Sequence, residues 1–498
     1  MKTIEENTNS DKNQIAIKAK TREIEIIKDE PFKNDKLNRE KYAKVLTSTV
    51  KAYQDGAVLA LNGAWGTGKT TFVKMWEQHL KNNGFPVIYY NAWEDDICEE
   101  PLFSLLRGLK NANDEEEKKA EKDKKLHSVF TVGSKIIAGI VSGAIKGFVE
   151  KYGKVVAEAV KGGVEAFEKE ITDSLEKEDE TTIVLEQFKE ELSEYVAFVC
   201  DEGKPLVYFI DELDRCSPSF AVKVLERIKH LFDVPNVVFV LSIDKQQLAY
   251  SINGYYGSDN INSMEYLRRF IDIDYYLPEP EPKDYCEYLF DYYGYSDFIF
   301  RDSRIKIDAG TVVTKEKDDF VSMATLIVQH KHLNLRQAER IFALARIALC
   351  EMSSNSKLFA DVYFLLAYLK VCEQEIFEKI DTLSYRLQEL IDVFEALATD
   401  DLIKDDENGY ACYLVTVCHL LFCYANSVSE VYRSPDPRYE TIYDMHSSEH
   451  SSNVTFNKFD KEQAYSIMYH YNQRRSDMTC RIEHFTKKLS LLEFFQIE

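Results

Sequence analysis

The apolar residues gather in five short runs, residues 57–61, 85–90, 206–212, 237–243 and 271–277. Each run has the length of a strand, and near-continuous apolar sequence is typical of strands buried on both faces of a parallel sheet. Segments with apolar residues at helical spacing separate the runs, such as residues 71–80 and the stretch that starts at Pro218, after Ser217 as the expected N-cap. Strands that alternate with helices predict an α/β fold, with helices on both faces of a parallel sheet.

The pattern changes after residue 281, where the spacing is helical over residues 333–349, 362–371, 376–394 and 411–425. The last of these segments contains no Asp, Glu, Lys or Arg, but at 15 residues it is too short to span a bilayer, so we expect a buried core helix. The expected organisation is a mobile tail over residues 1–30, a core over 31–110 and 181–280, a helical insert over 111–180, a helical lid over 281–350, and an all-helical C-terminal region over 351–498.

A glycine-rich octapeptide follows the first apolar run. Gly63-Ala64-Trp65-Gly66-Thr67-Gly68-Lys69-Thr70 matches the P-loop pattern G-x-x-x-x-G-K-[ST] at every fixed position. Between a strand and a helix this pattern forms a phosphate site, because the glycines let backbone N–H groups close around phosphate oxygens and the helix N-terminus favours negative charge. Lys69 would reach the β- and γ-phosphates, and the Thr70 hydroxyl would ligate Mg²⁺. The sequence therefore predicts a nucleotide-binding protein, with a chance match in a structural turn as the alternative.

Two carboxylates end the third apolar run, Asp211 and Glu212. At the end of a buried strand next to the P-loop strand, Asp211 would hold Mg²⁺, partly through Thr70. Glu212 is expected to point toward the other side of the strand end and to orient or deprotonate the attacking water, with Asp214 in reserve for this role. The alternative is a pair of exposed carboxylates at the start of a loop.

Six segments together form a distinctive set: Leu37-Asn38-Arg39, the P-loop octapeptide, Tyr90-Asn91-Ala92-Trp93, Ile210-Asp211-Glu212-Leu213-Asp214-Arg215-Cys216, Tyr266-Leu267-Arg268-Arg269-Phe270 and Asn334-Leu335-Arg336-Gln337. This set resembles the KAP family of P-loop NTPases, which takes its name from a neuronal membrane scaffold and a plasmid-encoded phage-exclusion protein. The resemblance implies an additional-strand P-loop ATPase with a helical lid. It also implies that Arg336 reaches the nucleotide as a second sensor and that Arg268 or Arg269 lies in an arginine-finger-like place. A plain surface helix is the alternative for the two adjacent arginines.

The candidate residues fall into four groups. Asp244 or Ser242, at the end of the fourth run, would sense the γ-phosphate. The candidate catalytic residues are Glu212, Asp214, Arg269 and Arg268, and the candidate metal ligands are Thr70 and Asp211. The candidate nucleotide-binding residues are Gly63, Trp65, Gly66, Thr67, Gly68, Lys69, Thr70, Thr71, Arg39, Asp244 and Arg336.

Composition narrows the choice of partner and compartment. The chain has 62 Lys and Arg against 85 Asp and Glu, a net charge of -23, so it is a poor general binder of nucleic acid and no sequence-specific nucleic acid is expected. The first 13 residues are polar and contain no apolar signal segment. The ten cysteines form no C-x-x-C pair and are expected to be reduced thiols, so the expected location is cytoplasmic.

The insert differs in charge from the rest of the chain. Residues 127–163 carry five lysines and two glutamates, and their apolar residues form one helical face. Many members of the resembling family carry transmembrane helices at this place, but the longest uncharged run here, residues 136–145, has 10 residues and cannot span a bilayer. Two interpretations stay open. Gly139, Gly143 and Gly147 permit close helix packing, within the chain or between subunits, whereas a cationic amphipathic stretch can also lie in an anionic membrane interface.

Three functional classes follow from these features. The leading hypothesis is an Mg²⁺-dependent ATPase whose hydrolysis drives a conformational change, in a homo-oligomer or with a partner protein bound by the C-terminal helices. By resemblance, its role would be phage defence or membrane-linked signalling. The second class is a nucleotide-gated scaffold with little turnover. The third, a nucleic-acid motor, is disfavoured by the acidic charge and by the lack of a basic, aromatic-rich groove.

Overall fold

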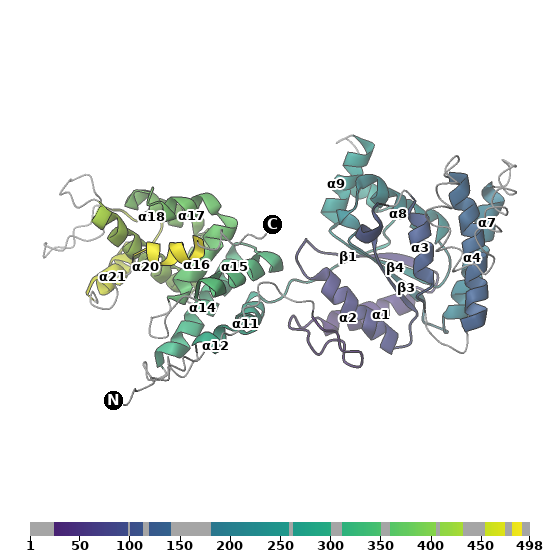
Figure 1. The fold of residues 1–498 in the computed structure, drawn as a ribbon, viewed down its shortest axis with the longest axis horizontal. Helices are drawn as coiled ribbons and strands as arrows, with labels where there is room; N and C mark the ends of the chain where they lie inside the picture. Colours follow the sequence, from purple (N-terminus) through teal and green to yellow (C-terminus); the bar gives the residue numbers. More distant parts are fainter. Residues whose placement is uncertain are drawn as a thin grey trace, which may run out of the picture. The chain divides into compact units, whose positions relative to one another are not determined.

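The computed structural model describes residues 24–97, 100–112, 119–140, 181–257, 262–299, 311–349, 359–404, 409–431, 454–473 and 481–490. Two compact units make up the chain, a core unit over Glu23–Glu279 and a helical unit over Met1–Arg22 and Pro280–Glu498 (Figure 1). Most of the expected N-terminal tail and of the insert, residues 1–23 and 141–180, lies outside the described residues.

The core unit is built on a five-stranded parallel sheet, as the apolar runs predict. Its strands are β1 (Ala57–Asn62), β2 (Val87–Asn91), β3 (Leu206–Asp211), β4 (Val237–Ile243) and β5 (Ile273–Tyr276). The order across the sheet is β2-β3-β4-β1-β5. The expectation that the Asp-Glu strand β3 lies next to the P-loop strand β1 is therefore wrong, because β4 pairs with both strands and separates them.

One face of the sheet is covered by α1 (Glu40–Ala52) and α2 (Lys69–Asn82). Phe72, Val73 and Trp76 of α2 pack on apolar residues of β1, β3 and β4. The buried indole of Trp76 donates from Nε1 to Thr47 Oγ1 of α1 at 2.9 Å, so its polar atom is satisfied inside the core. This packing fixes the start of α2, and with it the P-loop, relative to the ends of the strands.

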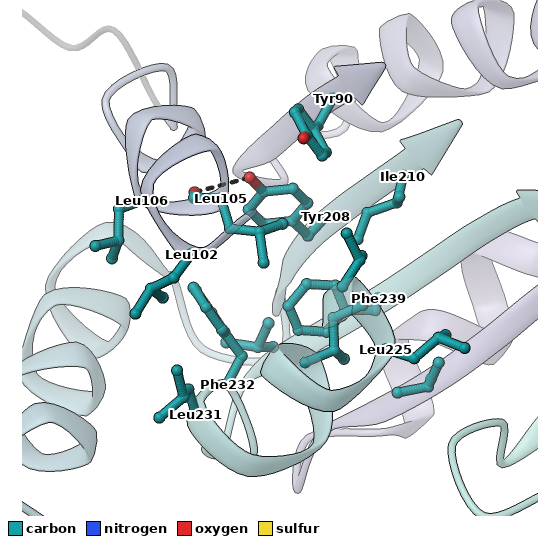
Figure 2. Close-up of a cluster of buried hydrophobic side chains, with 14 of the residues drawn as sticks. Tyr90, Leu102, Leu105, Leu106, Tyr208, Ile210, Leu225, Leu231, Phe232 and Phe239 are labelled. Atoms are coloured by element: carbon teal, nitrogen blue, oxygen red, sulfur yellow. Dashed lines mark hydrogen bonds between the residues drawn. The ribbon is translucent and has the colours of Figure 1, made fainter. Parts of the chain in front are cut away.

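The other face is covered by α3 (Pro101–Leu109), α8 (Pro218–Leu231), α9 (Lys245–Tyr256) and α10 (Ser263–Leu267). Two short 3-10 helices, η1 (Ala92–Asp95) and η4 (Leu213–Arg215), follow β2 and β3. Figure 2 shows the core of this face, where Tyr208 of β3 donates its hydroxyl to Leu105 O of α3 at 2.8 Å. The two elements approach so closely that a Cβ at Gly108 would lie 2.2 Å from the Tyr208 hydroxyl oxygen, which explains why glycine is required there.

The described part of the insert packs on the core unit. Helix α4 (Lys119–Ile140) lies along α7 (Thr181–Val199), and its residues Val129 and Phe130 are buried in the same apolar cluster as Phe188. At Gly133, α4 also packs closely against α3, since a Cβ there would lie 2.6 Å from a methyl carbon of Leu106. Of the three glycines that the sequence singled out, Gly139 lies in α4 and the other two lie outside the described residues. Packing is therefore established for α4, although through a different glycine.

The helical unit contains α11 (Pro282–Tyr292), α12 (Tyr295–Ile299), α14 (Thr311–His330), α15 (Leu335–Ala348), α16 (Ala360–Cys372), α17 (Gln374–Asp381), α18 (Leu387–Leu397), α19 (Asp400–Ile403), α20 (Gly409–Val431), α21 (Lys461–Gln473) and α22 (Glu483–Ser490). The single helix expected over residues 376–394 is two helices, because Leu383 adopts a left-handed φ of 53° that ends α17.

Helix α20 is longer than the sequence pattern indicated, at 23 residues rather than 15. The argument that this segment is too short to span a bilayer is therefore wrong. Among the described helices it is the one that is long and apolar enough to cross a membrane, over Gly409–Val428, and 61% of that window is buried inside the protein. That much burial is also what a core helix of a soluble unit shows, as the sequence analysis expected.

Candidate functional site

The P-loop joins the end of β1 to the start of α2. Gly66 and Gly68 have left-handed φ values of 84° and 79°, which glycine adopts at little cost. Thr67 Oγ1 donates to Ala64 O at 2.9 Å across the loop, and a Cβ on Gly63 would lie 3.0 Å from that hydroxyl. These contacts shape a tight loop whose conformation depends on its glycines.

Lys69 is the first residue of α2, and its side chain is buried, with 8% exposure. Its Nζ donates to Gly63 O and, at 3.2 Å, to Ala64 O. Burial lowers the pKa of Lys69, and the carboxylates of Asp214, Asp244 and Asp211 oppose that shift. The ammonium group therefore lies inside the loop with acidic side chains around it, where it can exchange the two carbonyl oxygens for phosphate oxygens. Thr70 and Thr71 follow on α2 and are partly buried.

Arg39 lies against the P-loop from the side of α1. This buried side chain donates from Nη2 to Thr67 O at 2.8 Å and from Nη1 to Gly68 O at 3.3 Å. The sequence analysis counted Arg39 among the nucleotide-binding residues, but these bonds go to the carbonyl oxygens of the loop itself. The guanidinium group thus supports the loop.

Asp211 ends β3, is 1% exposed, and lies on the sheet face that α2 covers, since Val207 and Phe209 of the same strand belong to that face. Its Oδ1 accepts the backbone N–H of Glu212 at 3.0 Å, and its Oδ2 accepts the hydroxyl of Tyr89 at 3.0 Å. Burial and the negative charge of Asp211 raise the pKa of Tyr89, so its phenol stays protonated and donates. Tyr89 was not predicted as a site residue, because the pairing of β2 with β3 could not be recognised from the sequence.

A buried polar atom lies beside Asp211. Ser242 of β4 pairs in register with Asp211 on one side and with Leu61 on the other, and it is fully buried. Its Oγ has no hydrogen-bond partner among the described residues. This hydroxyl is therefore available for a hydrogen bond to a ligand, an ion or a water molecule.

These side chains fit a magnesium ion bound with a nucleotide. The Thr70 hydroxyl and the Asp211 carboxylate are hard oxygen donors of the kind that Mg²⁺ prefers, and both Asp211 oxygens keep free lone pairs. Among the described residues no group of three or more His, Cys, Asp or Glu side chains forms a metal site. A P-loop magnesium ion does not require one, because phosphate and water oxygens complete its shell.

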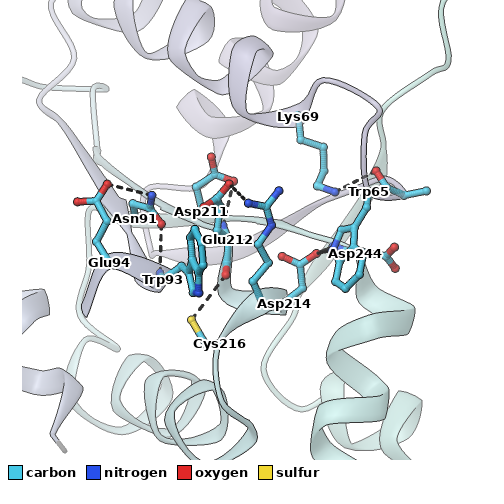
Figure 3. A network of polar contacts seen from close by, with 12 residues as sticks. Trp65, Lys69, Asn91, Trp93, Glu94, Asp211, Glu212, Asp214, Cys216 and Asp244 are labelled. Atoms are coloured by element: carbon cyan, nitrogen blue, oxygen red, sulfur yellow. Dashed lines mark hydrogen bonds and ion pairs between the residues drawn. The ribbon is translucent and has the colours of Figure 1, made fainter. Parts of the chain in front are cut away.

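Glu212 is held by an ion pair. The residue has a left-handed φ of 61°, an uncommon conformation outside glycine, and such strain often occurs at functional positions. Its Oε1 lies 2.7 Å from Nη1 of Arg215, and the Arg215 guanidinium carbon lies 5.9 Å from the centroid of the Trp93 ring. Figure 3 shows Glu212 and Trp93 near Asp211 and Cys216, and the Cys216 Sγ donates to Glu212 O at 3.6 Å. The carboxylate of Glu212, the candidate base, therefore forms an ion pair with Arg215, three residues further along the chain.

Asp214 connects the P-loop to the end of β4. Its Oδ2 accepts Nε1 of Trp65 at 2.7 Å and the backbone N–H of Asp244 at 2.8 Å (Figure 3). Burial raises the pKa of Asp214, and the hydrogen bond from Asp244 and the charge of Lys69 oppose that shift. Both hydrogen bonds end on Oδ2, so the Asp214 carboxylate links Trp65 of the P-loop to the backbone of Asp244 after β4.

Asp244 has a local role that the sequence did not predict. Its Oδ1 accepts the N–H groups of Gln246 and Gln247 at 3.1 and 3.2 Å, which makes it the N-cap of α9.

Ser217 was expected to cap a helix with its side chain, and it does not. It precedes α8 as expected, but its side chain makes no cap and donates to Asp96 Oδ1 at 2.7 Å.

The candidate arginines lie on the surface. Arg268 and Arg269 follow Leu267, the last residue of α10. Both are exposed, and Arg268 pairs with Glu265 at 2.9 Å. Arg336 is an exposed residue of α15 in the helical unit, and its reach to the nucleotide stays a prediction.

The sheet order, the P-loop after β1 and the carboxylate that ends β3 define a P-loop NTPase domain of the additional-strand type. The family model of the KAP family P-loop domain matches residues 39–295, just over half of the chain. The chain belongs to the KAP family, as the six sequence segments indicated. No curated protein matches it.

Proposed function

We propose that the core unit binds ATP together with Mg²⁺, hydrolyses it, and couples the nucleotide state to a conformational change or to assembly. The observation that carries this proposal is the unpaired, buried hydroxyl of Ser242, which lies beside Asp211 on the sheet face that α2 covers. A ligand, an ion or a water molecule at this place would complete the hydrogen bonding of that hydroxyl, and the oxygen donors of Thr70 and Asp211 suit Mg²⁺ bound with a nucleotide. Because Asp244 caps α9, Ser242 is the better candidate of the two for contact with the γ-phosphate.

The roles of the residues follow from their present partners. Lys69 exchanges its two loop carbonyls for phosphate oxygens, and Thr70 and Asp211 would hold the metal ion. Mg²⁺ supplies neutralisation of the charge on the β- and γ-phosphates. Glu212 leaves Arg215 and accepts a proton from water, which makes it the catalytic base.

Two substitutions test hydrolysis. Lys69→Ala removes the cation for the phosphates, so nucleotide binding should be largely lost. Glu212→Gln should bind ATP but release phosphate ~100-fold more slowly, within the range for losing a general base. Lys81→Ala on α2 and Glu94→Gln after β2 are matched controls, because their side chains bond to Glu77 and Asn91 and not to candidate site residues. Normal turnover by Glu212→Gln would refute its role and make Asp214 the better candidate.

A second function is favoured by a specific contact. The Glu212–Arg215 ion pair keeps the base occupied, which suits a nucleotide-gated scaffold in which ATP is bound and hydrolysed slowly. Multiple-turnover phosphate release separates the two candidates, since a scaffold would bind ATP tightly and release little phosphate.

Assembly is part of the proposal and rests on the exposure of Arg268 and Arg269. An exposed arginine promotes phosphoryl transfer only where it meets a γ-phosphate, which here belongs to a second copy. Arg269→Ala or Arg268→Ala should impair turnover more than binding, and mixing either variant with Glu212→Gln should restore part of the activity. A fully active monomer in ATP would refute this step.

Four further parts of the proposal rest on the sequence and its family resemblance. They are a partner protein for the helical unit, peripheral membrane contact through the insert, a cytoplasmic location and a role in phage defence.

A further inference from the structure

Arg39 is the residue before α1, and its side chain is 3% exposed. Its backbone is held by the carboxylate of Asp35, which accepts the N–H groups of Arg39 and, at 3.0 Å, of Leu37. Between them Asn38 has a left-handed φ of 52°, a conformation that Asn tolerates better than most residues. This turn aims the guanidinium group at the back of the P-loop.

The guanidinium group binds two successive peptides of the loop. Thr67 O belongs to the peptide whose N–H is that of Gly68, and Gly68 O belongs to the peptide whose N–H is that of Lys69. In a trans peptide the C=O and N–H groups point in opposite directions. The two N–H groups therefore point away from Arg39, and they belong to the first turn of α2, where N–H groups have no intrahelical partner.

The charge of Arg39 next to the carbonyl oxygens of Thr67 and Gly68 affects the N–H groups at the opposite side of the same peptides. Hydrogen bonds from a charged donor are about twice as strong as neutral ones. They also polarise the peptide that accepts them, which strengthens its N–H as a donor. Arg39 has a further contact, from Nη2 to Pro278 O at 3.5 Å, so its planar group spans the loop and the segment that follows β5. A lysine could place only one compact charge here, whereas the arginine fork reaches several oxygens at once.

We propose that Arg39 is a positioning residue of the P-loop, which holds the peptides after Thr67 and Gly68 so that the N–H groups of Gly68 and Lys69 face the β-phosphate. Arg39 itself makes no contact with the nucleotide. This inference rests on the proposed nucleotide binding. It predicts equal effects on ATP and ADP, because the two share the β-phosphate that the loop cradles.

The test measures dissociation constants of Mg-ATP and Mg-ADP, with binding stoichiometry and melting temperature, for the wild type and three variants. Arg39→Met should raise both dissociation constants by the same factor of ~10, the loss expected for charge-assisted bonds, with unchanged stoichiometry. Arg39→Lys, which keeps the charge and protects against misfolding, should give an intermediate rise in both. Arg107→Met is the matched control, because this arginine pairs with Asp95 on the surface and should leave both constants unchanged.

Several results would overturn the inference. A loss confined to ATP would mean direct contact with the γ-phosphate. A lower stoichiometry and melting temperature with unchanged dissociation constants would mean a purely structural role. Wild-type affinity in Arg39→Lys would show that the fork geometry is irrelevant. Absence of nucleotide binding by the wild type would instead refute the proposed function, and the inference would fall with it.

Discussion

The ion pair between Glu212 and Arg215 makes a prediction whose sign can be measured. The two side chains are 15% and 26% exposed, and their charged atoms lie 2.7 Å apart. The Arg215 guanidinium also lies over the ring of Trp93, which is itself 54% exposed. For Glu212 to accept a proton from water, its carboxylate must first leave this cation. The pair should therefore slow hydrolysis, and its removal should accelerate the chemical step.

The size of the effect follows from the exposure of the pair. Exposed ion pairs contribute about 0.2–1 kcal/mol, and a pair that is mostly shielded from solvent belongs at the upper end of that range. The contact with Trp93 adds little, because cation–π contacts at exposed sites are worth ~0.5 kcal/mol. Opening the pair therefore costs ~1 kcal/mol, which corresponds to a factor of ~5 in the population of free Glu212.

Single-turnover phosphate release measures this step. Arg215→Met keeps most of the side-chain volume and removes the charge, so we expect release ~5-fold faster with an unchanged ATP dissociation constant. Trp93→Ala should give a smaller acceleration, since it loosens Arg215 without removing the ion pair. Arg107→Met removes an arginine whose ion pair with Asp95 has the same 2.7 Å separation, and it should have no effect.

Two results would refute this reasoning. Slower release by Arg215→Met would show that Arg215 assists the reaction, either by orienting Glu212 or by stabilising transferred charge. Unchanged release would show that the ion pair is already open in the ATP complex. Faster phosphate release by Arg215→Met would also favour the scaffold function for the wild type, since it would show that Arg215 slows hydrolysis in the wild-type protein.

Two further predictions concern stability. A carboxyl whose pKa is raised on folding contributes stability that is fully present below its ordinary pKa, which is 3.8 for Asp214, and that is lost as pH rises through the raised value. The Asn side chain of Asp214→Asn cannot titrate. The melting temperature of this variant minus that of the wild type should therefore increase as the pH rises from 3.8 through the raised pKa of Asp214. A difference that does not change with pH would contradict the raised pKa. Gly108→Ala should lower the free energy of unfolding in urea by about 1–3 kcal/mol, because the new methyl group overlaps the Tyr208 hydroxyl, and Tyr208→Phe should relieve part of that loss.

The fold was predictable as far as each strand could be recognised alone. Every apolar run contains a strand, because burial on both faces leaves few polar positions in β1, β3 or β4. Their lateral order was not predictable from the same pattern. Runs of similar hydrophobicity pair equally well with one another, so nothing in β3 indicated that β4 would lie between it and the P-loop strand. The length of α20 was underestimated for a related reason, since Gly409 at its start and Asn426 and Ser427 near its end interrupt the apolar run but not the helix.

The site was predictable where the chemistry lies within one short segment. Residues 63–70 carry the phosphate loop and residues 211–214 carry the carboxylates, because a strand end must present them together. The sequence left Asp244 and Ser242 as alternatives for contact with the γ-phosphate and could not show how their surroundings differ. Ser242 lies in β4 and Asp244 follows it, and only the structure shows that Asp244 caps a helix while Ser242 is buried without a partner among the described residues.

The contacts that position the site could not be predicted from the sequence, because the partners come from distant segments, although Arg39 and Trp65 were themselves among the candidate residues. Arg39 precedes the loop carbonyl oxygens that it binds by 28 and 29 positions, Tyr89 precedes Asp211 by 122, and Trp65 precedes Asp214 by 149. Each of the three residues donates from its side chain to a loop carbonyl oxygen or to a buried carboxylate. The spacing of residues along the sequence does not indicate such contacts between distant segments. Yet each is required by the same physics, since a buried carboxylate or carbonyl left without a donor costs about 1–3 kcal/mol. A P-loop and an Asp-Glu strand end therefore imply that such donors exist. In this structure they come from the neighbouring strand, from the residue before a helix that covers the same face, and from the P-loop itself.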